Sequence, residues 1–373
     1  MVPLALILAV GAGAAVAIAL HGATPRQSLD AQRVYNRLEP SIVDVTSSLP
    51  YAAETAEGTG FVIDAAQGLV LTNNHVIDGA TSVSATIVTS GRTYPATVIG
   101  DNAGDDVALL RLRGATGLVA ASLGSASDAA PGDPVLGIGN SGGQGGPPTV
   151  VPGHVSSLGR TIKAVDQSSG FTEILRDMLQ VAGDIQPGDS GGPLADAAGQ
   201  VIGMDTAASR PSARAAAESF AIPIGIALAD ARQIGTGRTG AGVTIGRPAF
   251  LGAVVTDRSA TDPSDQFISY SETGGAVSPC LTTLQEAGIP ARVATARSGI
   301  LVEGVLCGTP ADTAGLGAGD VITAVAGRTV SSVRALSGVM TGLSPGQRVP
   351  VRWVAVGGAG RSATVRLGEG PAR

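Results

Sequence analysis

Short apolar runs broken by Gly, Asn and Asp dominate the chain from residue 41 to residue 112. The clearest runs are Ser41–Val45, Gly60–Ile63, Leu69–Thr72 and Val83–Val88. Runs of this length and composition, ended by turn residues, are typical of β-strands. A second stretch of the same kind covers about residues 133–226, and a small, turn-like stretch over 114–131 separates the two. Two β-rich blocks joined by a connector predict two barrels or sandwiches packed together.

The rest of the chain divides by composition. Residues 23–39 are polar and suit a linker or a short helix, and the first two β-rich blocks together cover residues 40–228. Residues 229–246 are rich in Gly, Thr and Arg, which predicts an interdomain linker. A third module is expected over residues 247–369. Its long polar stretch, about 256–298, has the character of an insertion.

The N-terminus begins with an apolar segment, Leu4–Leu20, that contains no charged residue. This length lies between that of a signal-peptide core and that of a membrane span. The triplet Ala17-Ile18-Ala19 resembles a small-x-small cleavage site. Residues 1–22 are therefore expected to act as a cleaved signal peptide or as a retained membrane anchor, and the sequence leaves both open.

Charge and cysteine content narrow the function classes. The formal net charge of the 373 residues is −6, which argues against nucleic acid as a main partner. The two cysteines, Cys280 and Cys307, exclude a multi-disulfide framework and a multi-cysteine metal site. They allow a single bridge, which would require an oxidising compartment.

The strongest chemical signal is the segment Gly188-Asp189-Ser190-Gly191-Gly192-Pro193-Leu194. Glycines on both sides of a serine allow a tight turn that directs backbone N–H groups to one point. A serine hydroxyl also needs an adjacent base before it becomes a nucleophile. Of the three histidines, His75 is the best candidate, because it follows the apolar run Leu69–Thr72 at a turn.

A carboxylate is needed to orient the imidazole. Asp106 adjoins the apolar run Val107–Leu110 and is the better candidate, whereas the preceding Asp105 is expected to face solvent. The order His75, Asp106, Ser190 is the order found in chymotrypsin-like proteases. It takes the first two residues from one β-rich block and the serine from the other, so we expect the triad in the cleft between two barrels.

These motifs together resemble the HtrA/DegP family of trypsin-like serine proteases with an attached PDZ domain. The matching segments are Gly58–Ile63, Thr72–Val76, Asp106–Leu110, Gly188–Leu194, Gly199–Met204 and Phe220–Ile224. The resemblance implies a mainly β chain, with a chymotrypsin-like double β-barrel protease domain and a PDZ domain behind the N-terminal export or anchor segment. It implies a serine endopeptidase with the triad His75, Asp106 and Ser190. It further implies an oxyanion hole made by the N–H groups of Gly188 and Ser190, and no metal or organic cofactor.

Two residues depart from the family pattern. Asp189 stands where the family commonly has Asn, and it needs N–H donors or an Arg to hold its charge. We therefore hypothesise that the loop around Ser190 (Gly188–Gly192, the nucleophile loop) rests in an inactive conformation until another event orders it. Asp184, six residues before Ser190, stands where the trypsin-like pattern places the base of the primary specificity pocket. It predicts a preference for Arg or Lys before the scissile bond, unless its side chain points elsewhere or is paired internally.

The C-terminal module resembles a PDZ domain through Ala249–Val254, Thr309–Ile322 and Val349–Val356. The resemblance implies that the N–H groups of Phe250, Leu251 and Gly252 capture a chain-terminal carboxylate, with the peptide added to the strand that follows. The predicted insertion carries Cys280, and Cys307 follows the next apolar run. A disulfide between them would pin the insertion to the PDZ core.

The leading interpretation is an exported endopeptidase that acts on unfolded or damaged envelope proteins and binds polypeptide substrates and C-terminal peptides. Two alternatives stay open. One is a non-catalytic, chaperone-like peptide-binding protein, and the other is a regulatory protease that cleaves one specific partner. Family members are often trimers or larger, so a homo-oligomer is also implied by the resemblance.

Overall fold

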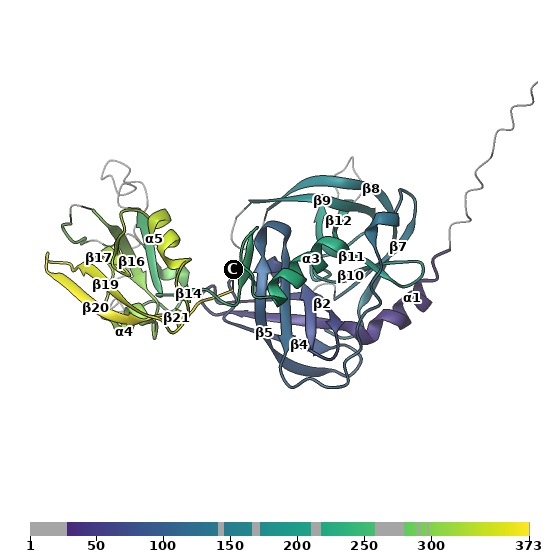
Figure 1. Ribbon diagram of the computed structural model, residues 1–373, viewed down its shortest axis with the longest axis horizontal. Coiled ribbons are helices and arrows are strands. Elements are labelled where there is room, and N and C mark those ends of the chain that lie inside the picture. Colours follow the sequence, from purple (N-terminus) through teal and green to yellow (C-terminus); the bar gives the residue numbers. More distant parts are fainter. Residues whose placement is uncertain are drawn as a thin grey trace, which may run out of the picture.

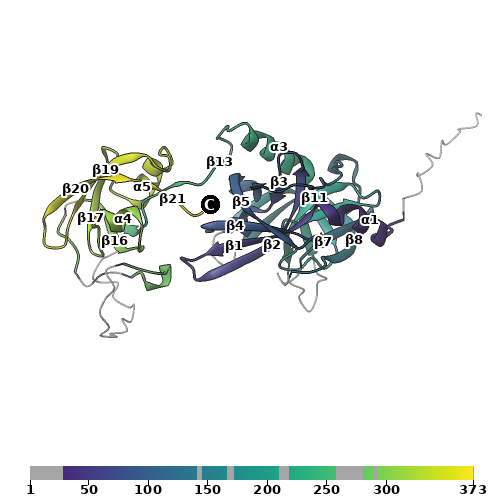
Figure 2. The same cartoon turned by 90° about the horizontal axis from the view of Figure 1, so that it is seen from below.

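The computed structural model describes residues 28–140, 145–165, 172–209, 218–257 and 280–372, apart from 289, 291 and 297. Strands make up most of the described chain, and they form a larger lobe and a smaller lobe joined by a narrow connection (Figures 1 and 2). The fold is the expected mainly β one, with two six-stranded barrels followed by a smaller, mainly β module.

The first barrel consists of strands β1 to β6, in which neighbouring strands are antiparallel. The strand order is β5-β4-β1-β2-β3-β6, and pairing of β5 with β6 closes the barrel. The bounds are Ile42–Leu49, Glu54–Asp64, Leu69–Thr72, Ser82–Ile87, Arg92–Asn102 and Val107–Leu112. The short helix α2 (Asn74–Ile77) follows β3, and a 3-10 turn, η2 (Ala103–Asp105), precedes β6.

The second barrel closes in the order β10-β11-β12-β9-β8-β7. The bounds of β7 to β12 are Pro134–Gly139, Thr149–Val165, Thr172–Ala182, Pro193–Asp196, Val201–Ser209 and Glu218–Pro223. A 3-10 turn, η3 (Ala126–Asp128), lies in the connector between the barrels. Helix α1 (Ala31–Leu38), followed by η1 (Glu39–Ser41), buries Val34 and Leu38 in the shared core, and the Arg33 guanidinium donates to Ala197 O.

Several strands of the first barrel are buried on both faces. Phe61, Leu71 and Leu109 belong to the cluster shared with the second barrel, whereas their neighbours Val62 and Val70 pack inside the first. Strands covered on both faces are continuously apolar rather than alternating. Burial on both faces explains the uninterrupted apolar runs in the sequence. Because one face packs against the second barrel, the ends of β3 and β6 lie beside that barrel.

The segment predicted as a linker, residues 229–246, is instead largely folded. Helix α3 (Ile224–Gly235) buries Ala227, Ala231 and Ile234, whose spacing of three to four residues puts them on one helix face. Strand β13 (Val243–Ile245) then pairs with β5. The prediction was wrong because alanine supplies much of this face, so the helical pattern has little contrast in a chain rich in Ala and Gly.

The smaller lobe contains a five-strand path in the order β15-β16-β17-β19-β20, with β18 paired to β17 and a separate β14–β21 pair. The bounds of β14 to β21 are Ala249–Phe250, Ala253–Asp257, Ile300–Val305, Val321–Val325, Arg328–Thr329, Arg348–Val354, Gly360–Arg366 and Gly368–Glu369. A 3-10 turn, η7 (Leu284–Glu286), precedes β16, and helices α4 (Pro310–Thr313) and α5 (Val333–Met340) complete the module. Its core includes Ile300, Val302, Val351 and Trp353.

Cys280 and Cys307 form a disulfide, with their Cα atoms 4.9 Å apart. Next to it, Leu281 forms a parallel bridge with Leu306 and donates its N–H to Val305 O. The C-terminal part of the predicted insertion is therefore fastened to the end of β16. Residues 258–279 of that insertion lie outside the described part of the chain.

Among the described residues, side chains and backbone on both lobes form direct contacts with each other. Tyr51, in the turn between β1 and β2, stacks on Phe250 with ring centroids 5.9 Å apart, and its carbonyl accepts from Leu284 N. In addition, Arg247 donates to the carbonyls of Ala80 and Thr81, which lie shortly after α2.

The segment Gly370–Ala372, which follows β21, reaches back to the first barrel. Ala372 N donates to Ala80 O, Ala372 O accepts from Gly79 N, and the Ala372 side chain is buried in the first-barrel cluster. This part of the chain therefore connects the smaller lobe directly to the region that follows α2, near the point where the lobes meet (Figure 2).

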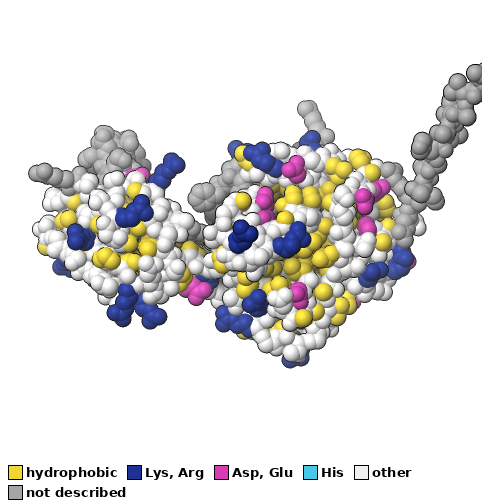
Figure 3. Space-filling model, in the orientation of Figure 1, with side chains coloured by type: hydrophobic (Ala, Val, Ile, Leu, Met, Phe, Trp, Pro, Cys, Tyr) yellow, Lys and Arg dark blue, Asp and Glu magenta, His cyan; other side chains and the backbone are white. Residues whose placement is uncertain are grey.

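The apolar segment at residues 4–20, and with it the choice between a cleaved signal and an anchor, lies outside the described residues. Among the residues that are described, no helix is both long and apolar enough to span a membrane. On the face shown in Figure 3, Lys and Arg side chains are scattered over both lobes rather than gathered in one patch.

Candidate active site

His75 lies in α2, directly after β3, and Asp106 lies directly before β6. Because β3 pairs with β6, these two turns meet at one edge of the first barrel. His75 Nδ1 is 2.9 Å from Asp106 Oδ2, and His75 N donates to Asp106 Oδ1 at 3.0 Å. The imidazole is about one-third exposed, whereas the carboxylate is buried. These contacts fix the orientation of the imidazole ring relative to the Asp106 carboxylate.

The turn at Asp106 has a positive φ of 53°, the left-handed region that Asp and Asn tolerate better than most residues. The Asn73 side chain donates to Asp106 O at 2.9 Å and holds this turn in place. The residue that precedes α2 therefore supports the carboxylate that His75 contacts.

Ser190 lies in the loop before β10 of the second barrel. A Cβ atom at Gly58 would lie 2.6 Å from Val76 Cγ2 and 3.1 Å from Ser190 O, so the nucleophile loop and the His75 helix flank the same glycine. At Gly191, a Cβ atom would lie 2.1 Å from Thr59 O and 2.4 Å from Thr72 Oγ1. Only glycine permits the loop to approach the first barrel this closely.

The N–H groups of the nucleophile loop divide into two sets. Asp189 N donates to Gln186 O, Gly191 N to Asp205 O and Gly192 N to Asp189 O. No hydrogen bond of the described residues uses the N–H groups of Gly188 and Ser190. The two amides expected to form the oxyanion hole are therefore the two that remain available.

Thr206, in β11, was not identified from the sequence. Its hydroxyl donates to Asp106 Oδ2, and its carbonyl accepts from Ser190 Oγ at 3.0 Å. Thr206 thus contacts both the carboxylate and the serine of the expected triad. The only sequence signal was a hydroxyl residue at the end of the run Val201–Asp205, the second apolar run after the serine motif.

Asp189 is buried and receives the N–H donor that the sequence required. Its Oδ2 accepts from Gln186 N at 2.8 Å, and its Oδ1 accepts from the Thr149 hydroxyl at 3.1 Å. The Asp189 carboxylate therefore links the nucleophile loop to Gln186, just before it in the chain, and to Thr149 at the start of β8. Whether the loop waits for an activating signal stays a prediction.

Asp184 is exposed, and its Oδ1 accepts from Gln186 Nε2 at 2.6 Å. The neighbouring Ile185 is buried instead. A second acidic residue, Asp205, is fully buried, and its two carboxyl oxygens accept no hydrogen bond from a described residue. Burial raises the pKa of this carboxyl well above its ordinary value, with a further contribution from Asp189.

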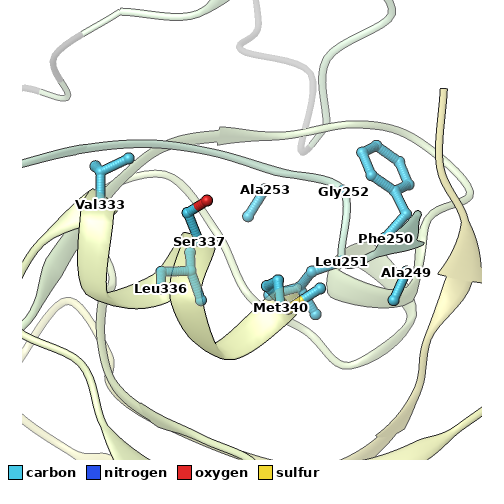
Figure 4. Close-up of a pocket in the computed structure, with 9 residues that line it drawn as sticks. All are labelled: Ala249, Phe250, Leu251, Gly252, Ala253, Val333, Leu336, Ser337 and Met340. Atoms are coloured by element: carbon cyan, nitrogen blue, oxygen red, sulfur yellow. The ribbon is translucent and has the colours of Figure 1, made fainter. Parts of the chain in front are cut away.

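The smaller lobe carries a pocket between the β14–β15 loop and helix α5. Figure 4 shows Phe250, Leu251 and Gly252 along one side and α5 along the other. From α5, the pocket is lined by Val333, Leu336, Ser337 and Met340. Within the described chain, the N–H groups of Leu251 and Gly252 make no hydrogen bond, so they are free to receive an acceptor.

Two family models match the chain. A trypsin-like peptidase domain matches residues 58–204, which includes His75, Asp106 and Ser190, and a PDZ domain matches residues 287–366. Both matches fall on the lobes described above, the first across the two barrels and the second on the smaller lobe.

Curated relatives are serine proteases. The chain is 30% identical to the serine protease PepD of Mycobacterium tuberculosis, an alignment that covers 91% of this chain and 66% of PepD. It is 29% identical to the periplasmic serine endoprotease DegP of Salmonella typhimurium, over 84% of this chain and 56% of DegP. The chain therefore spans between 56% and 66% of the lengths of these two relatives.

Among solved structures, the HtrA-type protease AlgW with a decapeptide is 26% identical with a TM-score of 0.48, covering 92% of this chain and all of the AlgW chain. The two family models and the curated relatives show that the chain is a homologue of the HtrA/DegP serine proteases that combines a trypsin-like peptidase domain with a PDZ domain.

Proposed function

We propose that the chain is an exported serine endopeptidase that hydrolyses peptide bonds in unfolded or damaged proteins of the cell envelope. The observation that carries the proposal is the pairing of His75 with Asp106 next to a serine loop whose two available amides are those of Gly188 and Ser190. Its relatives PepD and DegP are named serine proteases, which supports the same chemistry.

In the proposed reaction, Ser190 Oγ attacks the peptide carbonyl while its proton passes to His75 Nε2. Asp106 keeps the other ring nitrogen protonated and stabilises the imidazolium. The oxygen that gains negative charge accepts from the N–H groups of Gly188 and Ser190. His75 then gives its proton to the leaving amine, and a water molecule, deprotonated by His75, hydrolyses the acyl-enzyme.

The Ser190 hydroxyl must change partner before this attack. It donates to Thr206 O at rest and has to turn toward His75 Nε2 for proton transfer. Rotation about a single serine side-chain bond between staggered positions is sufficient. Because the Thr206 carbonyl is an ordinary neutral acceptor, the resting bond is not expected to hold the hydroxyl strongly.

The PDZ pocket is proposed to hold the C-terminal residues of polypeptide substrates or regulators. A carboxylate would accept from the free N–H groups near Leu251, and an apolar terminal side chain would lie against Leu336 and Met340. The preference for Arg or Lys before the scissile bond, inferred from Asp184, is a separate proposal, and it requires the Asp184 carboxylate to leave its hydrogen bond with Gln186 Nε2. A peptide-library cleavage profile dominated by Val, Leu or Ala at that position would contradict it.

Labelling with a fluorophosphonate probe, followed by mass mapping of the modified residue, tests the proposed function. We expect covalent labelling at Ser190 and casein hydrolysis that is lost in Ser190→Ala. A purified, folded chain that is not labelled and does not cleave casein would favour the non-catalytic peptide-binding alternative.

A further inference from the structure

Thr59, in the middle of β2, makes an unusual number of contacts to the nucleophile loop. Its backbone N–H donates to Ser190 O at 2.8 Å, and its hydroxyl donates to Gly188 O at 2.7 Å. The same hydroxyl accepts from Asn140 N at 2.9 Å. Thr59 is fully buried, so water cannot replace any of these partners.

These contacts fix the two carbonyls that flank Asp189. The carbonyls of Gly188 and Ser190 both point to one residue of the first barrel, although the loop itself belongs to the second barrel. A loop with glycines at positive φ, 99° at Gly188 and 85° at Gly191, has backbone freedom that its own sequence does not remove. The orientation of its peptide groups must therefore be set by outside partners, and Thr59 is one of them.

Thr59 is itself held by neighbours on two sides. The Thr72 hydroxyl donates to Thr59 O at 2.6 Å, and Asn140, at the end of β7, donates its N–H to the Thr59 hydroxyl. Thr72 lies three residues before His75 along the chain, and Asn140 belongs to the second barrel. Thr59 thus joins three regions: its backbone carbonyl contacts the His75 region through Thr72, and its hydroxyl contacts the second barrel at Asn140 and the nucleophile loop at Gly188.

We propose that Thr59 is a positioning residue for the oxyanion hole, whose hydroxyl holds the Gly188 carbonyl so that the N–H groups of Gly188 and Ser190 point toward the substrate carbonyl. The proposal rests on the proposed serine protease function. Thr59 touches no reacting atom, and it acts through the backbone of the loop. Removing the hydroxyl leaves both the Gly188 carbonyl and the Asn140 N–H without a partner, so the loop is expected to shift.

The test compares Thr59→Ser with Thr59→Ala, because these two variants lack the same methyl group and differ only in the hydroxyl. Thr59→Val removes the hydroxyl while keeping the shape, as an independent second deletion. Ser41→Ala is the matched control, since it removes a buried hydroxyl in η1, directly before β1, that donates to Leu38 O, away from the catalytic loop. Thermal unfolding of each full-length variant establishes that it is folded before kinetics are measured.

The readouts are kcat and KM on a peptide substrate and the second-order rate of fluorophosphonate labelling at Ser190. We expect Thr59→Ala and Thr59→Val to lower kcat and the labelling rate by roughly 10- to 100-fold with little change in KM, less than the ~10²–10³ lost with an oxyanion donor itself. Thr59→Ser and Ser41→Ala should stay close to the unmodified protein.

Two results would overturn the proposal. One is labelling of Thr59→Ala or Thr59→Val at the unmodified rate, and the other is a Thr59→Ser variant as slow as Thr59→Ala, which would assign the effect to packing of the methyl group. Absence of labelling in the unmodified protein is a different outcome, because it would contradict the proposed protease function.

Discussion

The proposed active site and the PDZ pocket are built on opposite principles. In the active site, buried polar groups are held by hydrogen bonds from several strands, as with Asp106, Thr206 and Thr59. In the PDZ pocket, most lining side chains are apolar, and they come from one loop and one helix (Figure 4). Chemistry requires donors fixed at the place where charge develops, whereas binding of an apolar chain end requires shape and a few free N–H groups. Because of this difference, we expect that a substitution can abolish catalysis or PDZ binding without affecting the other.

The largest expected effect is on the active site alone, in Asp106→Asn. Asn tolerates the left-handed backbone at this position, but it no longer orients and stabilises the imidazolium. We expect kcat to fall by roughly 10⁴-fold, as for the equivalent change in a serine protease triad. The measurement is peptide hydrolysis, with binding of a C-terminal peptide to the PDZ pocket as the control that should not change. Turnover within tenfold of the unmodified protein would contradict the assigned role.

The complementary change is Leu336→Glu in the PDZ pocket. Loss of an apolar contact worth about 1.5–3 kcal/mol corresponds to an affinity decrease of roughly 10- to 100-fold. Fluorescence anisotropy with a labelled peptide that ends in Val measures it. The control is Arg334→Gln, which alters the net charge equally on the same helix but at an exposed position. Unchanged affinity in Leu336→Glu, or equal losses of affinity in both variants, would show that the peptide binds elsewhere. Fluorophosphonate labelling of Ser190 should be unchanged in both variants.

A smaller effect concerns Asp44, which lies opposite Thr59 in the β1–β2 register. Burial raises the pKa of Asp44 to about 6, although a hydrogen bond from the Asn140 side chain opposes the shift. The folded state therefore binds this proton more tightly than the unfolded state, and the resulting stabilisation, complete below about pH 4, is lost as the pH rises through 6.

Asp44→Asn removes the buried charge, so we expect its melting temperature to exceed that of the unmodified protein at pH 8 and to match it at pH 4. For a domain of this size, each kcal/mol added to the free energy of unfolding raises the melting temperature by about 2–4 °C. Glu54→Gln, at an exposed position on the neighbouring strand, should show no such difference between the two pH values. A gain that is equal at both pH values would show that packing, and not ionisation, is responsible.

The sequence predicted the elements that depend on local pattern. The apolar runs predicted the strands of both barrels, and the placement of His75 after one run and Asp106 before another predicted their meeting, because the paired strands β3 and β6 bring those two ends together. The glycines around Ser190 likewise predicted a loop with free amides. In each of these places, residue type and position along a strand determine the geometry.

The residues that the sequence did not reveal depend on how the barrels dock. Thr59 and Thr206 are hydroxyl residues inside strands, a common pattern without a distinctive signal. Their contacts arise only when the barrels dock, which places β2 against the loop before β10 (Gly188) and β11 against the turn before β6 (Asp106). The folded segment at residues 229–246 was missed for a related reason, since its partner strand β5 is more than 120 residues away in the chain.

The contact of Ala372 with Gly79 and Ala80 changes how the chain can be divided. A fragment that stops after the second barrel would lack the residue that fills part of the first-barrel core, and it would expose the Gly79 N–H and the Ala80 carbonyl four to five residues beyond His75. Sequence modules and structural units therefore do not coincide here, and an isolated peptidase fragment is an altered protein rather than a neutral reference for the role of the PDZ domain.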